Sequence, residues 1–97
     1  MKLLFISQNN LSKKLGIYFK KRREKLGLQQ KDVAKALGYT SPQFISNMER
    51  GLSLPPLKKI KKLIKLYELP PEEVLKIIMS EQEKVLQSAI VGSKKAN

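Results

Sequence analysis

The sequence contains no cysteine, no histidine and no tryptophan. Without cysteine the chain can form neither disulfides nor thiolate metal ligands. Without histidine it lacks the commonest zinc ligand and the usual acid–base group of neutral pH. These absences exclude most types of catalytic and metal centre. We therefore expect no enzymatic activity, no catalytic residue, no metal site and no cofactor.

Long apolar runs are also missing. No stretch approaches the roughly 20 apolar residues that cross a bilayer, and the apolar patch at residues 3–6 is shorter than the core of a secretory signal peptide. Residues 2–6 have β-propensity but no obvious sheet to join, so residues 1–12 are assigned to an N-terminal extension. These features predict a cytoplasmic location and no membrane partner.

Acidic residues are scarce in the first two thirds of the chain, and the formal net charge is +12. Residues 13–65 hold 15 Lys and Arg against 3 Asp and Glu, whereas residues 66–93 hold 2 against 5. This asymmetry indicates a polyanionic partner for residues 13–65. Charge alone does not distinguish DNA, RNA, acidic lipid and acidic protein.

Glycine and proline divide most of the chain into five predicted helical segments, which makes the fold class all-α. The first is expected over residues 13–26, because Ser12 can cap its N-terminus and Gly27 stands where a left-handed residue would end it. Its inner face follows the helical period and consists of Leu15, Phe19 and Leu26.

The next two segments are short and adjacent. Residues 30–37 are expected to form one helix that Gly38 ends. Its inner face consists of Val33, Ala34 and Leu37. Ser41 then offers an N-cap and Pro42 a first helical position, where the missing N–H does no harm. A third helix over about residues 42–50 should follow.

The last two segments each follow a pair of prolines. Residues 57–67 are predicted to form a strongly amphipathic helix. Its apolar face consists of Leu57, Ile60, Ile64 and Tyr67, with Leu63 beside it. Its basic face consists of Lys58, Lys59, Lys61, Lys62 and Lys65. Two first-turn glutamates suit the positive end of a fifth helix within residues 70–91, and residues 92–97 are expected to be a flexible tail.

Residues 30–51 combine two short helices with a tight turn. The helices can cross steeply because Ala34 is small at their closest approach and Gly38 can adopt a left-handed turn. Their interior would be closed by Val33, Leu37, Ile45 and Met48. Over about residues 15–75 the chain resembles the Cro and phage-repressor type of helix-turn-helix protein, the XRE-like family.

The resemblance rests on residues that occur together at the family's spacing. They are Leu26-Gly27-Leu28-Gln29-Gln30, Val33-Ala34, Leu37-Gly38, Ile45 through Gly51, and Pro55, Leu57, Ile60 and Leu63. The resemblance implies a five-helix, lambda-repressor-like fold, with a helix-turn-helix DNA-binding domain over residues 13–69 and an extended C-terminal helix over residues 70–91. The turn has one residue more than the commonest family pattern, so residues 41–44 are interpreted as a longer-turn variant.

The resemblance further implies that the helix starting near Ser41 enters the DNA major groove with its N-terminal part. Gln43 and Asn47 are four residues apart and share a face, and each can pair bidentately with an adenine edge. The predicted base-reading residues are Gln43, Ser46, Asn47 and Pro42. Phe44 is expected to pack rather than to contact a base.

Phosphate-contacting and structural residues complete the predicted site. The resemblance places Gln30 at a position that binds backbone phosphate. The full phosphate-contacting set is Gln30, Lys31, Ser41, Arg50 and Lys58. In the family, an arginine late in the first helix pairs with the glutamate that closes the third. Arg23 and Glu49 stand at these positions, which implies a structural ion pair.

A single helix-turn-helix contacts only a few base pairs, so useful selectivity requires a two-fold homodimer that reads two half-sites. The fifth helix carries the apolar stripe predicted to form the dimer, which consists of Val74, Ile78, Val85 and Ala89. This stripe is flanked by Leu75, Ile77, Leu86 and Ile90. The alternative is that all of it packs on the protein's own core or on residues 3–6.

These features predict a sequence-specific regulator of transcription, a repressor that binds double-stranded DNA at the nucleoid. The alternative is an antitoxin-type interaction module that binds a toxin and also its own promoter. A membrane-surface role for the basic helix fits poorly, because its apolar face is needed for the core and tryptophan is absent. RNA binding fits poorly because exposed aromatics for base stacking are few.

Overall fold

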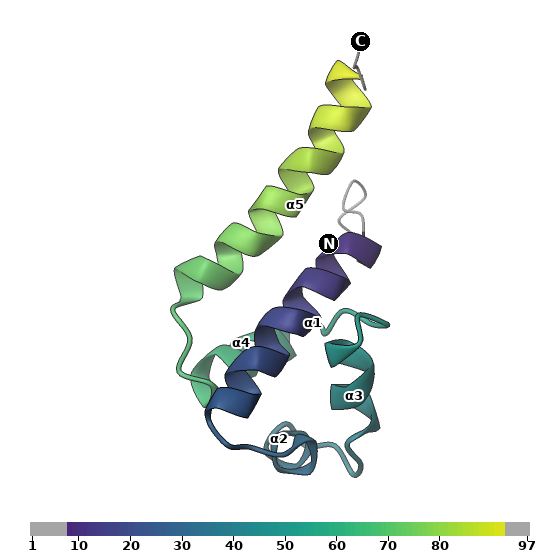
Figure 1. Ribbon diagram of the computed structural model, residues 1–97. Coiled ribbons are helices and arrows are strands. Elements are labelled where there is room, and N and C mark those ends of the chain that lie inside the picture. Colours follow the sequence, from purple (N-terminus) through teal and green to yellow (C-terminus); the bar gives the residue numbers. More distant parts are fainter. Residues whose placement is uncertain (1–7, 93–97) are drawn as a thin grey trace.

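The computed structural model describes residues 8–92, and within them all regular structure is helical. The helices are α1 (Gln8–Lys25), α2 (Gln30–Ala36), α3 (Gln43–Glu49), α4 (Leu57–Leu66) and α5 (Pro71–Val91) (Figure 1). The predicted all-α fold with five helices is confirmed. None of the described helices is long and apolar enough to span a membrane. The predictions for residues 2–6 and 93–97 lie outside the described residues.

α1 begins at Gln8, earlier than the predicted start at residue 13. Ser12, the predicted N-cap, lies inside the helix and is 5% exposed. The prediction was wrong because Leu11 is buried one turn before Leu15. This extra turn extends the face of α1 that packs on the core.

Glycines end α1 and α2 as predicted. Gly27 and Gly38 have φ angles of +73° and +88°, a left-handed region that glycine adopts without strain. The N–H of Tyr39 donates to the carbonyl oxygen of Ala34 at 2.8 Å and closes the last turn of α2. Leu26, predicted on the inner face of α1, is 38% exposed in the turn. That prediction was wrong because the helix ends one residue earlier.

The apolar face of α4 is centred on Leu63, which is fully buried, and includes Ile60 and Tyr67. Leu57 was predicted on this face, but it is 71% exposed. Leu57 lies roughly 120° around the helix from Leu63, because successive residues turn by about 100°. The prediction for Leu57 was therefore wrong, and the buried face is narrower than the sequence indicated.

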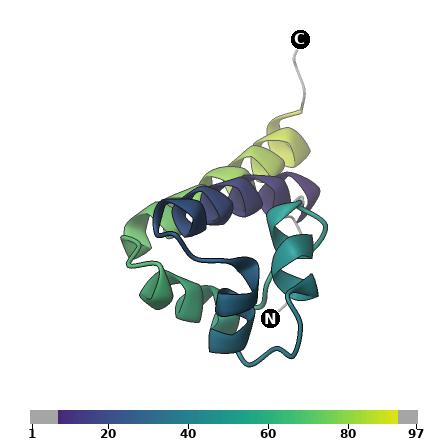
Figure 2. The ribbon, with the colours of Figure 1, turned by 60° about the horizontal axis from the view of Figure 1, so that its bottom comes forward.

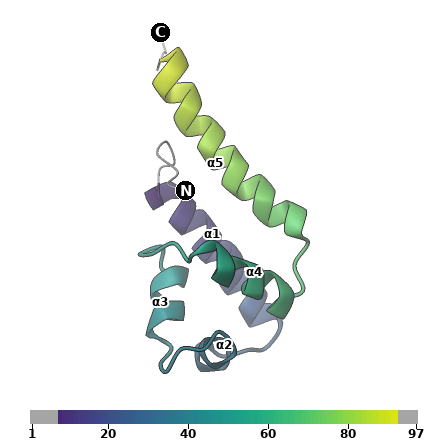
Figure 3. The same cartoon turned by 180° about the vertical axis from the view of Figure 1, so that it is seen from behind.

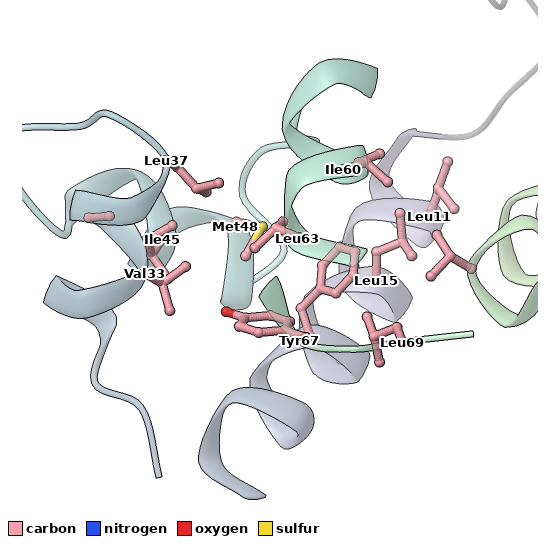
Figure 4. Close-up of a cluster of buried hydrophobic side chains, with 13 residues drawn as sticks. Leu11, Leu15, Val33, Leu37, Ile45, Met48, Ile60, Leu63, Tyr67 and Leu69 are labelled. Atoms are coloured by element: carbon pink, nitrogen blue, oxygen red, sulfur yellow. The ribbon is translucent and has the colours of Figure 1, made fainter. Parts of the chain in front are cut away.

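The hydrophobic core lies among α1, α2, α3 and α4 and includes Val74 from the first turn of α5 (Figure 4). Its buried members are Leu11, Leu15, Phe19, Val33, Ala34, Leu37, Ile45, Met48, Ile60, Leu63, Tyr67, Leu69 and Val74. Burial of each large apolar side chain contributes about 1.5–3 kcal/mol of transfer free energy. Ile45 and Met48 are fully buried, so one face of α3 is fixed to this core and the opposite face is left to solvent.

α1 and α3 approach each other closely at Gly16. A Cβ atom on Gly16 would lie 2.9 Å from the carbonyl oxygen of Glu49 and would also meet the carbonyl oxygen of Met48. Both neighbours are backbone atoms, which cannot rotate away as a flexible side chain would. The absence of a side chain at Gly16 therefore allows α3 to lie directly against α1. Sequence analysis missed this glycine, because hydrophobic periodicity carries no signal for a close backbone approach.

α5 runs beside α1 and extends past it (Figures 1 and 2). A buried carboxylate joins the two helices. The side chain of Glu81 is 3% exposed and pairs with the ammonium groups of Lys14 in α1 and Lys84 in α5. The hydrogen bond from Lys14 is the main cause that lowers the pKa of Glu81 below its usual value of 4.5. Sequence analysis did not single out Glu81, which was only one of the acids in the negatively charged segment of residues 66–93.

The apolar residues of α5 divide between two faces. Val74 is 2% exposed in the core of its own chain, so its predicted role in a dimer contact was wrong. Ile78 and Val85 are half-buried, and Ala89 is exposed. A different face carries large apolar side chains that are more than half exposed, and we call these residues the outer stripe: Leu75, Met79 and Ile90.

Candidate nucleic-acid interface

α2, the turn after it and α3 lie together at the end of the molecule away from the C-terminus (Figure 3). The outward face of α3 carries the polar side chains of Gln43, Ser46, Asn47 and Arg50. Gln43 and Arg50 are exposed, whereas Ser46 and Asn47 are half-exposed. These side chains form a polar surface on a helix whose other face is locked into the core.

The start of α3 differs by one residue from the prediction. Pro42 is the N-cap rather than the first helical residue. Its carbonyl oxygen accepts the first helical hydrogen bond, from the N–H of Ser46 at 2.9 Å. The hydroxyl oxygen of Ser41 accepts a hydrogen bond from the N–H of Gln43 at 3.3 Å. Ser41 thus still satisfies a backbone donor at the start of α3, one position before the cap.

Hydrogen bonds align three of these side chains in a row along α3. The side-chain amide of Gln43 donates to Oδ1 of Asn47 at 2.9 Å, and Nη2 of Arg50 donates to the same oxygen at 2.9 Å. Gln43 keeps its amide oxygen and a second N–H, the two groups that a bidentate contact to adenine needs. Asn47 keeps both of its amide N–H donors. We call Gln43, Asn47 and Arg50 the polar row.

A buried ion pair joins α1 to the end of α3. Nε of Arg23 donates to Oε2 of Glu49 at 2.6 Å, and Nη2 donates to Oε1 at 3.0 Å. The third nitrogen of the guanidinium donates to the carbonyl oxygen of Leu28 at 2.8 Å. Hydrogen bonding to Glu49 is the main cause that raises the pKa of Arg23. The structure therefore brings together the two residues that the family resemblance pairs.

Gln30 takes part in the same network. Its side-chain amide donates to Oε1 of Glu49 at 2.9 Å, and its side chain is half-buried. One amide N–H of Gln30 is thus used inside the protein, and the second N–H is left for a phosphate oxygen. Sequence analysis did not predict this link. The start of α2, the end of α1 and the end of α3 therefore meet at Glu49.

The turn between α2 and α3 is held by an aromatic pair. The rings of Tyr39 and Phe44 stack with centroids 4.3 Å apart and planes inclined by 19°. Nζ of Lys59 lies 4.9 Å from the centroid of the Tyr39 ring and donates to the carbonyl oxygen of Leu37 at 2.8 Å. Phe44 packs as expected. Lys59, predicted on the basic face of α4, is half-buried, because its ammonium group binds the carbonyl oxygen of Leu37 at the end of α2.

The helix-turn-helix family model HTH_3 matches residues 19–74, which is more than half of the chain. The match begins in α1, includes all of α2, α3 and α4, and ends in the first turn of α5. The protein belongs to this helix-turn-helix family. The resemblance to the Cro and phage-repressor type is confirmed, and the chain is a DNA-binding regulator of transcription. No curated protein and no solved structure matches the chain.

The other predicted phosphate-contacting residues of this helix-turn-helix protein come from different elements. Lys31 belongs to α2, Ser41 to the turn, Arg50 follows α3 and Lys58 lies in the first turn of α4. All four side chains are exposed. Lys31 and Ser41 line one concavity beside the turn, which Lys58 and Arg50 do not line. Three of these four side chains are cationic and the fourth is a hydroxyl, and groups of both kinds bind phosphate oxygens.

Proposed function

We propose that this protein is a repressor that binds specific sites in double-stranded DNA and reads the major groove with α3. The polar row is the observation that carries this proposal. Its side chains stand outward on a helix fixed through Ile45 and Met48, so they can enter a groove without any rearrangement of the core. Side-chain amides of this kind recognise adenine through its N6 and N7 atoms.

In this proposal, contacts with the phosphates of the DNA backbone supply most of the affinity for DNA. The formal net charge is +12, and the basic residues concentrate before α5. Each lysine or arginine that neutralises a phosphate releases a counterion. Binding should therefore weaken steeply as salt rises, whereas recognition of the site by Gln43 and Asn47 should persist.

We also propose that the protein binds DNA as a homodimer formed through α5. The outer stripe supports this, because its large apolar side chains are exposed along one face of a helix that extends past α1. Leu75 and Met79 are one turn apart, and Ile90 continues the same face three turns later. A two-fold dimer reads two half-sites about 34–36 Å apart and gains the selectivity that one half-site lacks.

An antitoxin-type module is the competing proposal. It needs an acidic surface on α5 for a basic toxin, but two of the acids are already engaged. Glu81 is buried with two lysines, and Glu73 accepts a hydrogen bond from the hydroxyl of Tyr18 at 2.6 Å. If the protein regulates its own promoter only in complex with a second protein, this alternative is favoured over a repressor that acts alone.

Selection of bound duplexes from a random pool, with purified full-length protein, tests the proposed function. The expected result is an enriched sequence with two-fold symmetry. A promoter that carries this sequence should then lose transcription when the protein is expressed, and a scrambled site should not respond. A pool that shows no enrichment would contradict sequence-specific binding. Increased transcription would contradict repression while leaving DNA binding intact.

A further inference from the structure

A concavity lies between α2 and the turn that follows it. Its volume is about 330 Å³. The lining residues from α2 are Lys31, Asp32, Ala34 and Lys35, and those from the turn are Tyr39, Thr40, Ser41 and Pro42. We call this concavity the turn pocket. Lys35, Thr40 and Tyr39 belong to none of the contacts predicted from the sequence.

The side chains of the turn pocket suit an oxyanion. Lys31 and Lys35 contribute two ammonium groups, and Thr40 and Ser41 contribute two hydroxyls. The oxygen of Ser41 accepts a hydrogen bond from the backbone of α3, so its own O–H is left to donate. Two cations and two hydroxyl donors on one concave surface are the groups that bind phosphate.

The lining contains one acid, Asp32, against two lysines, so its formal charge is +1. The carboxylate of Asp32 accepts a hydrogen bond from the backbone N–H of Gln29 at 2.9 Å. It forms the capping box of α2 and is thus committed to the start of the helix. The two lysines outnumber this carboxylate, so the lining keeps a positive formal charge.

The turn itself is a fixed wall of the pocket. Stacking of Tyr39 on Phe44 and the bond from Lys59 to the carbonyl of Leu37 hold the backbone on either side of Gly38. Thr40 and Ser41 are therefore presented by a braced segment. This is also the segment in which the chain has one residue more than the commonest pattern of its family.

We propose that the turn pocket binds one phosphate of the DNA backbone, next to the base pair that Gln43 contacts. The pocket includes Ser41 and Pro42, which directly precede Gln43, so a duplex read by Gln43 brings its backbone to this surface. This inference rests on the proposed reading of DNA by α3. The proposal adds Lys35 and Thr40 to the phosphate-contacting residues. It also gives the longer turn a function, which is to hold Thr40 and Ser41 against the phosphate.

Salt titration of duplex binding tests the role of Lys35. The variant Lys35→Gln removes one ammonium group of the pocket. Lys65→Gln is the matched control, because it removes an exposed lysine from α4, which does not line the pocket. The proposed dimer would lose one phosphate contact in each half-site, so the plot of log K against log salt should become less steep by about 1.8. Between 50 and 200 mM salt, the loss of affinity should therefore be about 12-fold smaller for Lys35→Gln than for the wild type.

A scan with neutral phosphates locates the contact. Duplexes of the selected site, each carrying one methylphosphonate, are titrated with wild type, Lys35→Gln and Thr40→Val. One methylphosphonate position should weaken the wild type but have little further effect on Lys35→Gln, and a smaller loss of sensitivity is expected for Thr40→Val. Lys65→Gln should respond like the wild type at that position.

The outcomes separate this proposal from the proposed function. If the wild type prefers a selected site but Lys35→Gln responds to every methylphosphonate as the wild type does, the turn pocket binds no phosphate and α3 still reads DNA. A second outcome is that the wild type binds all duplexes with equal affinity, while one methylphosphonate weakens the wild type and has no effect on Lys35→Gln. This result would support phosphate binding by the turn pocket and contradict base reading by α3. A wild type that binds no duplex overturns both.

Discussion

Arg23 and Glu49 join α1 to the end of α3 through two hydrogen bonds, at 2.6 and 3.0 Å. The residues are only 9% and 6% exposed. Water cannot readily replace either partner at such burial, so each charge depends on the other. Because α3 has only seven residues, a fixed C-terminal end determines the direction in which the whole helix presents its polar row.

Replacement of Glu49 by alanine should destabilise the fold without any DNA present. The guanidinium of Arg23 would stay buried without its carboxylate, and Gln30 would lose its acceptor. We expect the free energy of unfolding in urea to fall by about 3 kcal/mol, the lower end of the range of about 3–5 kcal/mol found when one partner of a buried pair is removed. Glu24→Ala removes an exposed acid of α1 and should change stability by less than about 0.5 kcal/mol. Equal melting temperatures for the two variants would make the pair energetically irrelevant.

Gly16→Ala should destabilise the protein, although alanine normally stabilises a helix relative to glycine by about 0.8–1 kcal/mol. The added Cβ would meet the backbone carbonyls of Met48 and Glu49, and overpacking of this kind costs about 1–3 kcal/mol. Calorimetric melting checks the sign. Ile17→Ala, a change at an exposed neighbour on α1, is the control. A higher melting temperature for Gly16→Ala would mean that α1 and α3 can separate at little cost.

Glu81 should make stability depend on pH in the acidic range. Because the folded protein holds the pKa of Glu81 below 4.5, mainly through Lys14, its pairing stabilises the fold above about pH 4.5. That contribution is lost as the pH falls through the folded-state pKa. Melting temperatures between pH 7 and pH 3 should fall less steeply for Glu81→Gln than for the wild type. Glu83→Gln, an exposed acid on the same helix, should follow the wild-type curve, and parallel curves for all three proteins would refute the assignment.

The boundaries predicted best are those marked by glycine and proline. Gly27 and Gly38 end α1 and α2 because left-handed backbone is a local property that the sequence shows directly. The start of α1 was missed because it depends on contacts with distant parts of the chain and not on a local signal. The Ser12 side chain could cap a helix, but distant parts of the chain bury Leu11, and the helix therefore begins before Ser12.

Sequence analysis located the outward face of α3, because Gln43 and Asn47 are one helical turn apart and Ile45 and Met48 mark the inner side. It could not show which of the two apolar faces of α5 packs on α1. Val74 and Leu75 are adjacent and equally apolar, yet one is buried and the other exposed. That choice depends on how α5 crosses α1, which Glu81 helps to fix.

Gln43→Ala should weaken binding to the selected DNA site by about 1–3 kcal/mol for each half-site and relax discrimination at one base pair in each half-site. The variant removes the amide oxygen and N–H that are proposed to contact a base but leaves the core side of α3 unchanged. Affinities for a set of single-base variants of the site measure this. Gln87→Ala, an exposed glutamine on α5, should bind like the wild type. Equal weakening on every sequence would assign Gln43 to a phosphate instead of a base.

The outer stripe should form the dimer, and its disruption should leave the monomer folded. Leu75 and Met79 are more than half exposed, so the double change Leu75→Glu and Met79→Glu removes no core contact but places two carboxylates in the proposed interface. Sedimentation equilibrium at tens of micromolar should give a dimer for the wild type and a monomer for the double variant, with unchanged circular dichroism. Gln87→Glu adds one carboxylate elsewhere on α5 and should remain dimeric. Binding to a symmetric DNA site should weaken strongly only for the monomeric variant, because two linked half-site contacts become independent. A double variant that still sediments as a dimer would place the interface on another surface.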